Sequence, residues 1–418
     1  MTSRDRAHPP PAGAGAAAPG APTRAHAAPP TAPGAWSGLS GTQRRIALEL
    51  LRHGRMSRAD LMERVRISAG SITRLTSPML ESGTLLAAAE RVSATGRPQS
   101  HLEVDAGAER LVGVTLSGRH LTAVLTDLRL TVLASTRLEI TDHAPEAVVA
   151  LLARAVGDLR SRLTDDGTPV TGLGLTLGGS SRDGRAVDEA VFLGWHGVRL
   201  AEAVEAATGI PTLVGNDLTA MTERELWFGA GREHERFSLV TVGAGIGYGL
   251  VVNGSVVSSP DAQLGLMGMV PVPDGGFPPV SSPAMACLTD AALERAWSER
   301  LEAGGRHWGP DRGARAARIL SLAEDGDGDA VAVCASFARR LGRFIGITAA
   351  FTLPETVIVA GERASVASLF EAQVMAGIAA VRRSSAAPLD VVVREHDRAQ
   401  WARGAAVLVL RARIAGEL

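Results

Sequence analysis

Residues 57–98 read SRADLMERVRISAGSITRLTSPMLESGTLLAAAERVSATGRP, and this stretch decides how the chain is organised. Ser57 and Asp60 have the spacing of a capping box, in which a serine and an acid three residues later satisfy the free amides at the start of a helix. Leu61 and Val65 lie one helical turn apart behind it. The motif predicts a short helix that begins after Ser57.

A second helix is predicted after Ser68, because serine is a preferred N-cap residue. Ile67 and Ile72 occupy the two positions of a hydrophobic staple around that cap. If Ile72 and Leu75 face inward, the outward-facing side chains are those of Ala69, Gly70, Ser71, Thr73 and Arg74. We expect Pro78 to stop or kink this helix, since proline has no N–H and clashes with the preceding turn.

An amphipathic helix precedes these two, beginning after Ser40 or Thr42 and ending at Gly54. Residues 84–87 and 101–105 are predicted strands. The loop between the strands holds the four residues Arg91, Gly96, Arg97 and Pro98. Three short helices followed by a hairpin with a long loop are typical of a winged helix-turn-helix, a DNA-binding module.

The charge distribution favours this interpretation over a generic three-helix bundle whose arginines only solvate its surface. Residues 42–100 contain ten arginines and five acidic residues, whereas the whole chain has a formal net charge of −1. A basic module on an acidic body is the electrostatic pattern of a DNA-binding protein.

Each outward residue of the second helix and of the loop has an expected role on DNA. We expect Thr73 and Arg74 to contact bases, and Ser68 and Ser71 to contact phosphates. The small side chains of Ala69 and Gly70 would let the helix backbone approach the major groove. Two loop arginines complete the predicted interface, namely Arg91 and Arg97, of which Arg97 is expected in the minor groove.

Length and composition set further limits. A chain of 418 residues with 45% hydrophobic residues can fill more than one core. Residues 1–38 are almost wholly Ala, Pro, Gly and polar residues, so we expect a disordered tail. No apolar run is long enough for a transmembrane helix or a secretory signal, and we therefore expect a cytoplasmic protein. The two cysteines, Cys287 and Cys334, are too few for a disulfide framework.

The remainder, residues 106–418, has the pattern of an α/β body. Predicted strands occupy residues 112–116, 122–127, 131–140, 172–177, 211–214, 238–242, 248–252, 356–360 and 389–394. Predicted helices occupy residues 145–163, 200–208 and 218–228, and the final third is mainly helical.

Two segments of this body carry a resemblance to a known family. FLGWHGVRLAEAVEAATGIPTLVGND, residues 192–217, resembles the sugar-pocket region of the ROK family of repressors, open reading frames and kinases. TVGAGIGYGLVVNG, residues 241–254, resembles that family's second phosphate loop. The preceding winged helix-turn-helix, with GRP at 96–98, matches the repressor branch, which includes xylose and N-acetylglucosamine repressors. The resemblance implies an actin-like (ribonuclease-H-like), two-lobed ATPase fold over residues 106–418, behind a DNA-binding domain at 39–105.

The resemblance also assigns residues to the cleft between the lobes. It implies that Asp217 occupies the position of the kinase base and Asn216 that of a sugar ligand, although both residue types also favour a helix N-cap. Trp195 and His196 are further candidates for an effector pocket. Core packing remains the alternative for Trp195, and a structural role is the alternative for His196. The glycines of 243–249 fit either an anion-binding loop or an ordinary hairpin turn.

Several family positions needed for phosphoryl transfer and for zinc are changed. Residues 115–118 read TLSG and lack the family's aspartate, and Glu362 follows Gly361 where the family has a second glycine. The family's Glu-x-Gly-His segment aligns with residues 266–269, LMGM, which removes a sugar-binding carboxylate and a zinc-binding imidazole. Its cysteine cluster aligns with Val280, Ser282 and Cys287, and one soft ligand cannot hold tetrahedral zinc.

The sequence therefore predicts a transcription regulator and not an enzyme. We expect a repressor of carbohydrate transport or catabolism genes that binds no metal or cofactor. A sugar or sugar-derived compound is the candidate effector; because the family's sugar-binding acid is lost, an effector other than a simple hexose, or none, is the alternative. A homodimer or homotetramer would place two recognition helices on an inverted repeat. The alternatives are an active sugar kinase that also binds DNA, and a scaffold whose helix-turn-helix contacts proteins.

Overall fold

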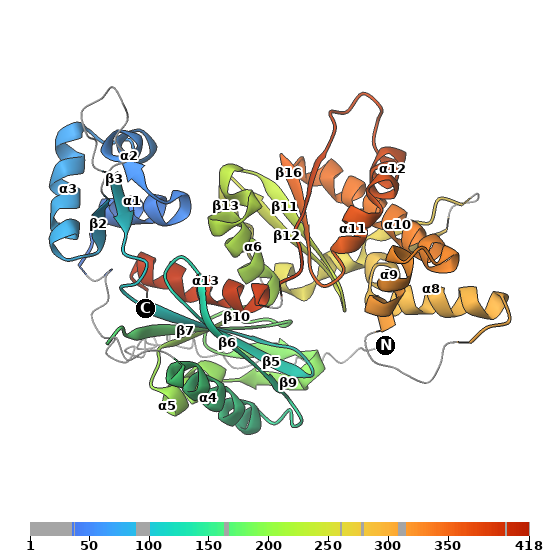
Figure 1. Ribbon diagram of the computed structural model, residues 1–418, viewed down its shortest axis with the longest axis horizontal. Helices are drawn as coiled ribbons and strands as arrows, with labels where there is room; N and C mark the ends of the chain where they lie inside the picture. Colours follow the sequence, from blue (N-terminus) through green and yellow to red (C-terminus); the bar gives the residue numbers. More distant parts are fainter. Residues whose placement is uncertain are drawn as a thin grey trace, which may run out of the picture. The chain divides into compact units, whose positions relative to one another are not determined.

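The computed structural model describes residues 36, 38–88, 101–162, 167–259, 261–276, 280–307, 315–397 and 399–417 (Figure 1). The first part is a small module of three helices and three strands, residues 38–104, called the N-terminal module below. Its elements are α1 (Gly41–His53), β1 (Met56–Ser57), α2 (Arg58–Val65), α3 (Ala69–Glu81), β2 (Leu85–Ala88) and β3 (His101–Val104). β3 pairs antiparallel with both other strands, in the order β1-β3-β2.

The predicted helix caps are confirmed. Ser40 and Ser57 each form a capping box, with Gln43 and Asp60 respectively, and Ser68 accepts the amide of Ser71 at the start of α3. α1 ends at Gly54, whose φ of 81° is a conformation that glycine adopts without a steric penalty.

The expected stop at Pro78 is wrong, because α3 continues through Pro78 to Glu81. The residue that follows the proline, Met79, is fully buried in the core of the module. Within the same helix the hydroxyl of Thr76 donates to the carbonyl of Ile72. Packing of the last turn therefore outweighs the local cost of the proline.

The wing predicted from the sequence lies largely outside the described residues. Strands β2 and β3 flank it as expected, but Arg91, Gly96, Arg97 and Pro98 fall in the segment 89–100, which the structure does not describe. β1 was not predicted. It extends the hairpin to a three-stranded sheet.

The packed chain begins before the predicted domain boundary at residue 39. Trp36, which the composition assigns to the tail, is 2% exposed and belongs to the hydrophobic cluster that contains the core of the N-terminal module. That cluster also includes Phe237 and Ile414 of the body, so the module and the body share a core.

The first lobe of the body is a five-stranded sheet in the order β10-β7-β4-β5-β6. Its strands are β4 (Arg110–Leu116), β5 (His120–Thr126), β6 (Val132–Glu139), β7 (Val170–Leu177) and β10 (Thr212–Asn216). The first three form an antiparallel meander, and β7 and β10 add in parallel. Helices α4 (Pro145–Ser161) and α5 (Leu200–Thr208) cover one face (Figure 1).

The second lobe repeats this topology. Its sheet has the order β13-β12-β11-β16-β17, again a meander with two parallel strands added beside its first strand. The strands are β11 (Phe237–Val242), β12 (Ile246–Val252), β13 (Ser255–Val256), β16 (Thr356–Ala360) and β17 (Asp390–Val393). Val357 and Val359 face one core, and Ile358 and Ala360 face the other, as strand alternation requires.

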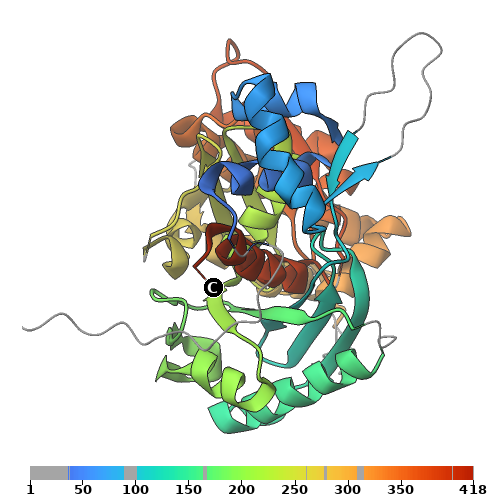
Figure 2. The same ribbon diagram turned by 90° about the vertical axis from the view of Figure 1, so that its left-hand side faces the viewer.

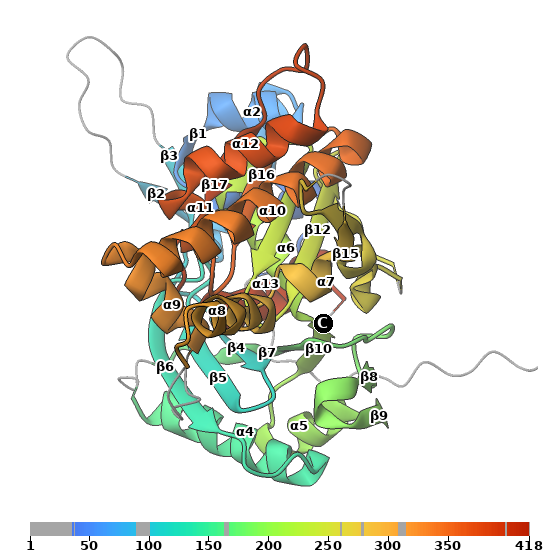
Figure 3. The ribbon, with the colours of Figure 1, turned by 90° about the vertical axis from the view of Figure 1, so that its right-hand side faces the viewer.

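Helices cover both faces of the second sheet. Five helices cover the face that carries Val357 and Val359, as Figure 3 shows. They are α8 (Asp290–Ala303), α9 (Arg315–Glu324), α10 (Gly328–Thr352), α11 (Ser365–Leu369) and α12 (Glu371–Val381). On the other face lies α6 (Asp217–Phe228), which follows directly after β10 of the first lobe. The remaining segment between β13 and α8 forms β14 (Pro271–Pro273), β15 (Ser281–Pro283) and the short helix α7 (Ala284–Cys287).

The last helix, α13 (Gln400–Ala415), returns to the first lobe and lies between its sheet and the N-terminal module (Figure 2). Glycines let it approach the strands closely. A Cβ on Gly113 or Gly174 would overlap the carbonyl oxygen of Ala402 or Ala405 respectively. No helix in the described part of the chain is long and apolar enough to span a membrane.

Candidate nucleic-acid interface and ligand cleft

The outer face of α3 carries the residues predicted to contact DNA. Ile72 and Met79 are buried beneath this helix, and Leu75 is partly buried. On the opposite face, Ser71 is partly exposed. The other four predicted positions are exposed, namely Ala69, Gly70, Thr73 and Arg74. Ser68 is also exposed. The hydroxyl groups of Ser68 and Ser71 hydrogen bond to each other at 3.0 Å.

This face has the chemistry of a recognition surface. It combines a small-residue start, which permits close approach, with hydroxyl groups and one guanidinium group. The guanidinium of Arg74 forms no ion pair with any acidic side chain among the described residues. It is therefore free to donate to a phosphate or to a guanine edge.

The second candidate site lies where β10 passes into α6. Asn216 is the N-cap of α6, and its Oδ1 accepts the amide of Thr219 at 2.9 Å. Its amide nitrogen donates to the carbonyl of Gly179, 2.9 Å away, in the turn after β7. Both hydrogen-bonding ends of the side chain are thus engaged, and the cap role is the one that the structure shows for Asn216.

Asp217 is the first residue of α6. Its Oδ1 accepts the amide of Leu218 at 2.7 Å, and its Oδ2 lies beside Gly178, where a Cβ would be 3.5 Å away. Burial raises the pKa of Asp217 to about 6, with a smaller contribution from the negative charge of Glu362 and against the effect of the Leu218 amide. A carboxyl group with a pKa near neutrality can accept or donate a proton.

Phe192 was not singled out from the sequence, and it contributes to the same region. Its ring packs against Gly118 and Gly178, since a Cβ on either glycine would lie 3.6 or 3.7 Å from a ring carbon. It is 37% exposed. An aromatic face beside a carboxylate offers an apolar surface and a hydrogen-bond acceptor to one ligand. The two glycines that its ring contacts are far from it and from each other in the sequence, so no local sequence pattern predicts these contacts.

The glycine segment 243–249 forms a hairpin. β11 and β12 pair antiparallel in register from Phe237 with Val251 to Val242 with Ile246, which leaves residues 243–245 as the turn. The amide of Gly243 donates to the carbonyl of Gly245 at 3.0 Å. A Cβ on Gly243 would overlap the carboxylate of Glu362, so this acid lies directly against the turn. An anionic side chain in that position opposes the binding of a nucleotide phosphate.

The positions expected to have lost zinc contain no replacement site within the described chain. Leu266 and Met269 are exposed on a single 3-10 turn, and Cys287 is buried at the end of α7. Burial raises the pKa of the Cys287 thiol, which disfavours the thiolate that a metal requires. Among the described residues, no three His, Cys, Asp or Glu side chains lie close enough together to hold a metal ion.

The other two effector candidates belong to the strand β9 (Trp195–Val198). Trp195 is 3% exposed in the core of the first lobe, and its indole N–H donates to the carbonyl of His143 at 2.7 Å. His196 is exposed on β9 (Trp195–Val198), opposite Glu189 of β8 (Val187–Ala190). The structure therefore gives Trp195 a packing role and leaves His196 at the surface.

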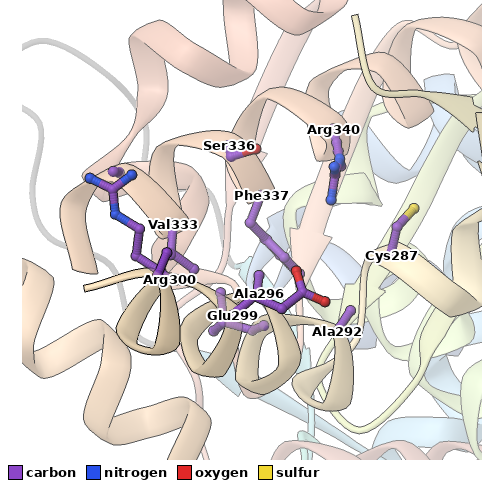
Figure 4. A pocket seen from close by; sticks show the side chains of 12 residues that line it. Cys287, Ala292, Ala296, Glu299, Arg300, Val333, Ser336, Phe337 and Arg340 are labelled. Atoms are coloured by element: carbon purple, nitrogen blue, oxygen red, sulfur yellow. The ribbon is translucent and has the colours of Figure 1, made fainter. Parts of the chain in front are cut away.

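One groove of about 390 Å³ lies elsewhere in the second lobe, between α8 and α10 (Figure 4). Its lining combines apolar side chains, such as those of Val333 and Phe337, with the charged groups of Glu299, Arg300 and Arg340. None of the candidate effector residues lines it. It is thus separate from the region around Asp217.

Comparison with known proteins identifies a family and relatives that resemble this chain. The model of the ROK family matches residues 111–412. The DNA-binding transcriptional dual regulator NagC of Escherichia coli K12 is 24% identical over 315 residues, 74% of this chain and 77% of NagC.

Two solved structures share the fold. A ROK family transcriptional regulator described as a homolog of the E. coli MLC protein superposes with a TM-score of 0.71 at 22% identity, covering 90% of this chain and 97% of that one. A ROK family glucokinase from Streptomyces griseus, in complex with glucose and AMPPNP, gives a TM-score of 0.59 at 22% identity over 72% of this chain and 98% of the kinase. The resemblance to regulators and to sugar kinases is thus confirmed, and the chain belongs to the ROK family.

Proposed function

We propose that this protein is a DNA-binding transcription regulator, a repressor of carbohydrate transport or catabolism genes. Its N-terminal module acts as a winged helix-turn-helix, and its kinase-like body binds a sugar or sugar-derived effector and holds the oligomer together. The observation that carries the proposal is the outer face of α3, where Ser68, Thr73 and Arg74 are exposed above a buried Ile72.

The body supports regulation better than phosphoryl transfer. A sugar kinase needs a base, and it needs groups that neutralise the charge on the transferring phosphate. Asp217 could serve as the base, but the carboxylate of Glu362 lies against the glycine turn where a phosphate would have to bind. Residue 115 is a threonine in β4, so it adds no carboxylate for a metal ion. We therefore propose a protein without kinase activity.

As a homodimer or homotetramer, the regulator would present two copies of α3 to an inverted repeat, spaced by one or more DNA turns. An effector shifts the equilibrium between DNA-binding states only if it binds those states with different affinity. The region around Asn216, Asp217 and Phe192 is the proposed site of that effector.

The test is selection of bound sequences from genomic fragments of the source organism with the purified full-length chain. We expect an enriched inverted repeat near transport or catabolic genes, and an affinity that falls steeply with added salt. No enrichment at low salt, with and without a panel of glucose, xylose and N-acetylglucosamine, would contradict the proposal. ATP consumption in the presence of those sugars would instead support the kinase.

A further inference from the structure

Two arginines of α1 bind the carboxyl-terminal ends of two body helices. Arg44 Nη1 donates to the carbonyl of Ala415, the last residue of α13, at 2.7 Å. Arg52 Nη2 lies 3.3 Å from the carbonyl of Leu226 in the last turn of α6, and 3.4 Å from that of Arg232. The last carbonyls of a helix lack intrahelical partners and carry its negative dipole end, so a cation is stabilised there.

Hydrogen bonds between α1 and the end of α6 are donated from both sides. Arg232, in the turn that follows α6, donates from Nη1 to the carbonyl of Arg52 at 3.1 Å. Beside it, the Nδ1 of His53 lies 3.4 Å from Glu233 Oε1. The end of α1 is therefore fixed to the end of α6 by backbone and side-chain groups of both.

The opposite ends of the same two helices lie near Asp217 and Glu362, in the proposed effector region. Asp217 begins α6. Trp401, the second residue of α13, donates from Nε1 to Glu362 Oε1 at 3.2 Å, and the other carboxylate oxygen of Glu362 faces the glycine turn. The charge of Glu362 also contributes to the raised pKa of Asp217.

Close packing joins α6 and α13 along their length. A Cβ on Gly404 of α13 would lie 3.2 Å from backbone atoms of Ala220 and Met221 in α6. Further along, Arg411 Nη1 is 3.3 Å from Glu223 Oε1, a carboxylate that is almost fully buried. Because packed interiors resist compression, a displacement at one end of such a pair is felt at the other.

We propose that Arg44 and Arg52 are positioning residues that couple the N-terminal module to the effector region through α6 and α13. They contact neither effector nor DNA. They hold α1 against the far ends of two helices whose first residues border the effector region. The inference rests on the proposed function, because it supplies the route by which an effector alters DNA binding, but its test requires neither effector nor DNA.

The experiment is hydrogen exchange of the full chain at pH 7.5, with Asp217→Asn as the perturbation in the effector region. Removing a partly buried charge that repels Glu362 should slow exchange of the α6 amides. Only amides that exchange by local opening are compared, because a rise in global stability slows every amide that needs global unfolding. If the coupling is present, these α1 amides slow as well, about threefold or more, while those of α4 in the first lobe change less. The same comparison is repeated in chains that carry Arg44→Gln and Arg52→Gln together.

In the chain that carries both Arg44→Gln and Arg52→Gln, we expect Asp217→Asn still to slow exchange of the α6 amides. The exchange rates of the α1 amides should change by less than about 1.5-fold, since coupled residues show non-additive effects. Arg45→Gln is the matched control. Arg45 belongs to the same helix but donates to Val65 inside the module, so the transmitted slowing should persist. Arg52→Lys keeps a cation at the end of α6, so part of the transmitted slowing of α1 exchange should remain.

Equal slowing of α1 with and without Arg44 and Arg52 would overturn the proposal. So would no slowing of α1 in the parent chain, or slowing that α4 shares, which would report global stability alone. If the DNA selection fails while the exchange result holds, the coupling stands and the regulator assignment falls. The two hypotheses are therefore separable.

Discussion

Arg413 in α13 and Glu109, the residue before β4, form an ion pair that is almost completely buried. Arg413 Nε lies 3.0 Å from Glu109 Oε2, and the two side chains are 4% and 2% exposed. The hydroxyl of Thr171 donates to the same carboxylate oxygen, and Arg413 Nη1 donates to the carbonyl of Thr171. The three residues join the last helix to the first two parallel strands of the body.

Glu109→Gln should destabilise the protein by about 3–5 kcal/mol, because it leaves a buried guanidinium without its counter-charge. Urea unfolding followed by circular dichroism measures the change. Glu139→Gln, at the end of β6 and outside the core, is the matched control and should stay within about 0.5 kcal/mol of the parent. A loss below about 1 kcal/mol for Glu109→Gln would mean that water reaches the pair.

Arg74→Ala should weaken binding to the selected operator by about 1–3 kcal/mol and relax the preference at one base pair, if its guanidinium contacts a guanine. Fluorescence anisotropy with operator and scrambled duplexes makes the comparison. Arg154→Ala removes the same charge from the exposed surface of α4 and should change neither affinity. Equal losses on both duplexes for Arg74→Ala would make it a phosphate contact.

Asp217 should make the fold less stable at neutral pH than at acid pH. Its pKa is raised from 3.8 to about 6, so the folded chain holds this proton more tightly than the unfolded chain does. The ionised form therefore costs up to about 3 kcal/mol above pH 6, and this penalty disappears as the pH falls from 6 to below 4.

Asp217→Asn removes the penalty, so it should raise the free energy of unfolding at pH 7.5 and change it little near pH 4. Urea titrations of both chains across this range give the difference directly. A stabilisation that grows toward acid pH would show that the carboxylate is held in its charged form by groups that burial does not outweigh.

Local signals made the N-terminal module predictable. Ser40, Ser57 and Ser68 each satisfy an amide within three residues, so the start of every helix in the module could be located from neighbouring residues alone. The central strands β11 and β16 of the body are buried at every residue, so they were recognisable as short apolar runs and not by alternation. The stop predicted at Pro78 was wrong, since α3 continues past it through the buried Met79, and burial of that side chain is a tertiary contact that the local sequence does not reveal.

The residues of the candidate site were harder to predict from the sequence, because their contacts join positions far apart in the chain. Asp217 could be identified only through a family resemblance, and nothing local indicates that Phe192 packs on Gly118 and Gly178. The contacts of Arg44 and Arg52 join residues more than 170 positions apart. A pattern of period 2 or 3.6 contains no information about such pairs.

Gly174→Ala should be strongly destabilising, because its Cβ would collide with the Ala405 carbonyl of α13. Overpacking of a rigid core costs about 1–3 kcal/mol, and a backbone contact leaves little room for relief. Gly157→Ala in α4 is the matched control: a Cβ there meets no atom within 4 Å. That change should stabilise the helix by about 0.5–1 kcal/mol. Thermal unfolding of the two variants should therefore move in opposite directions.

Zinc should have no effect on this protein. A structural zinc site contributes folding energy outright, so its removal lowers the melting temperature. Here Leu266 and Met269 supply no ligand, and the Cys287 thiol is held in its neutral form by burial, which raises its pKa. We expect the melting temperature to be the same in EDTA and in a slight excess of Zn²⁺. Stoichiometric zinc that survives dialysis, measured by atomic emission, would contradict this and would require ligands from outside the described residues.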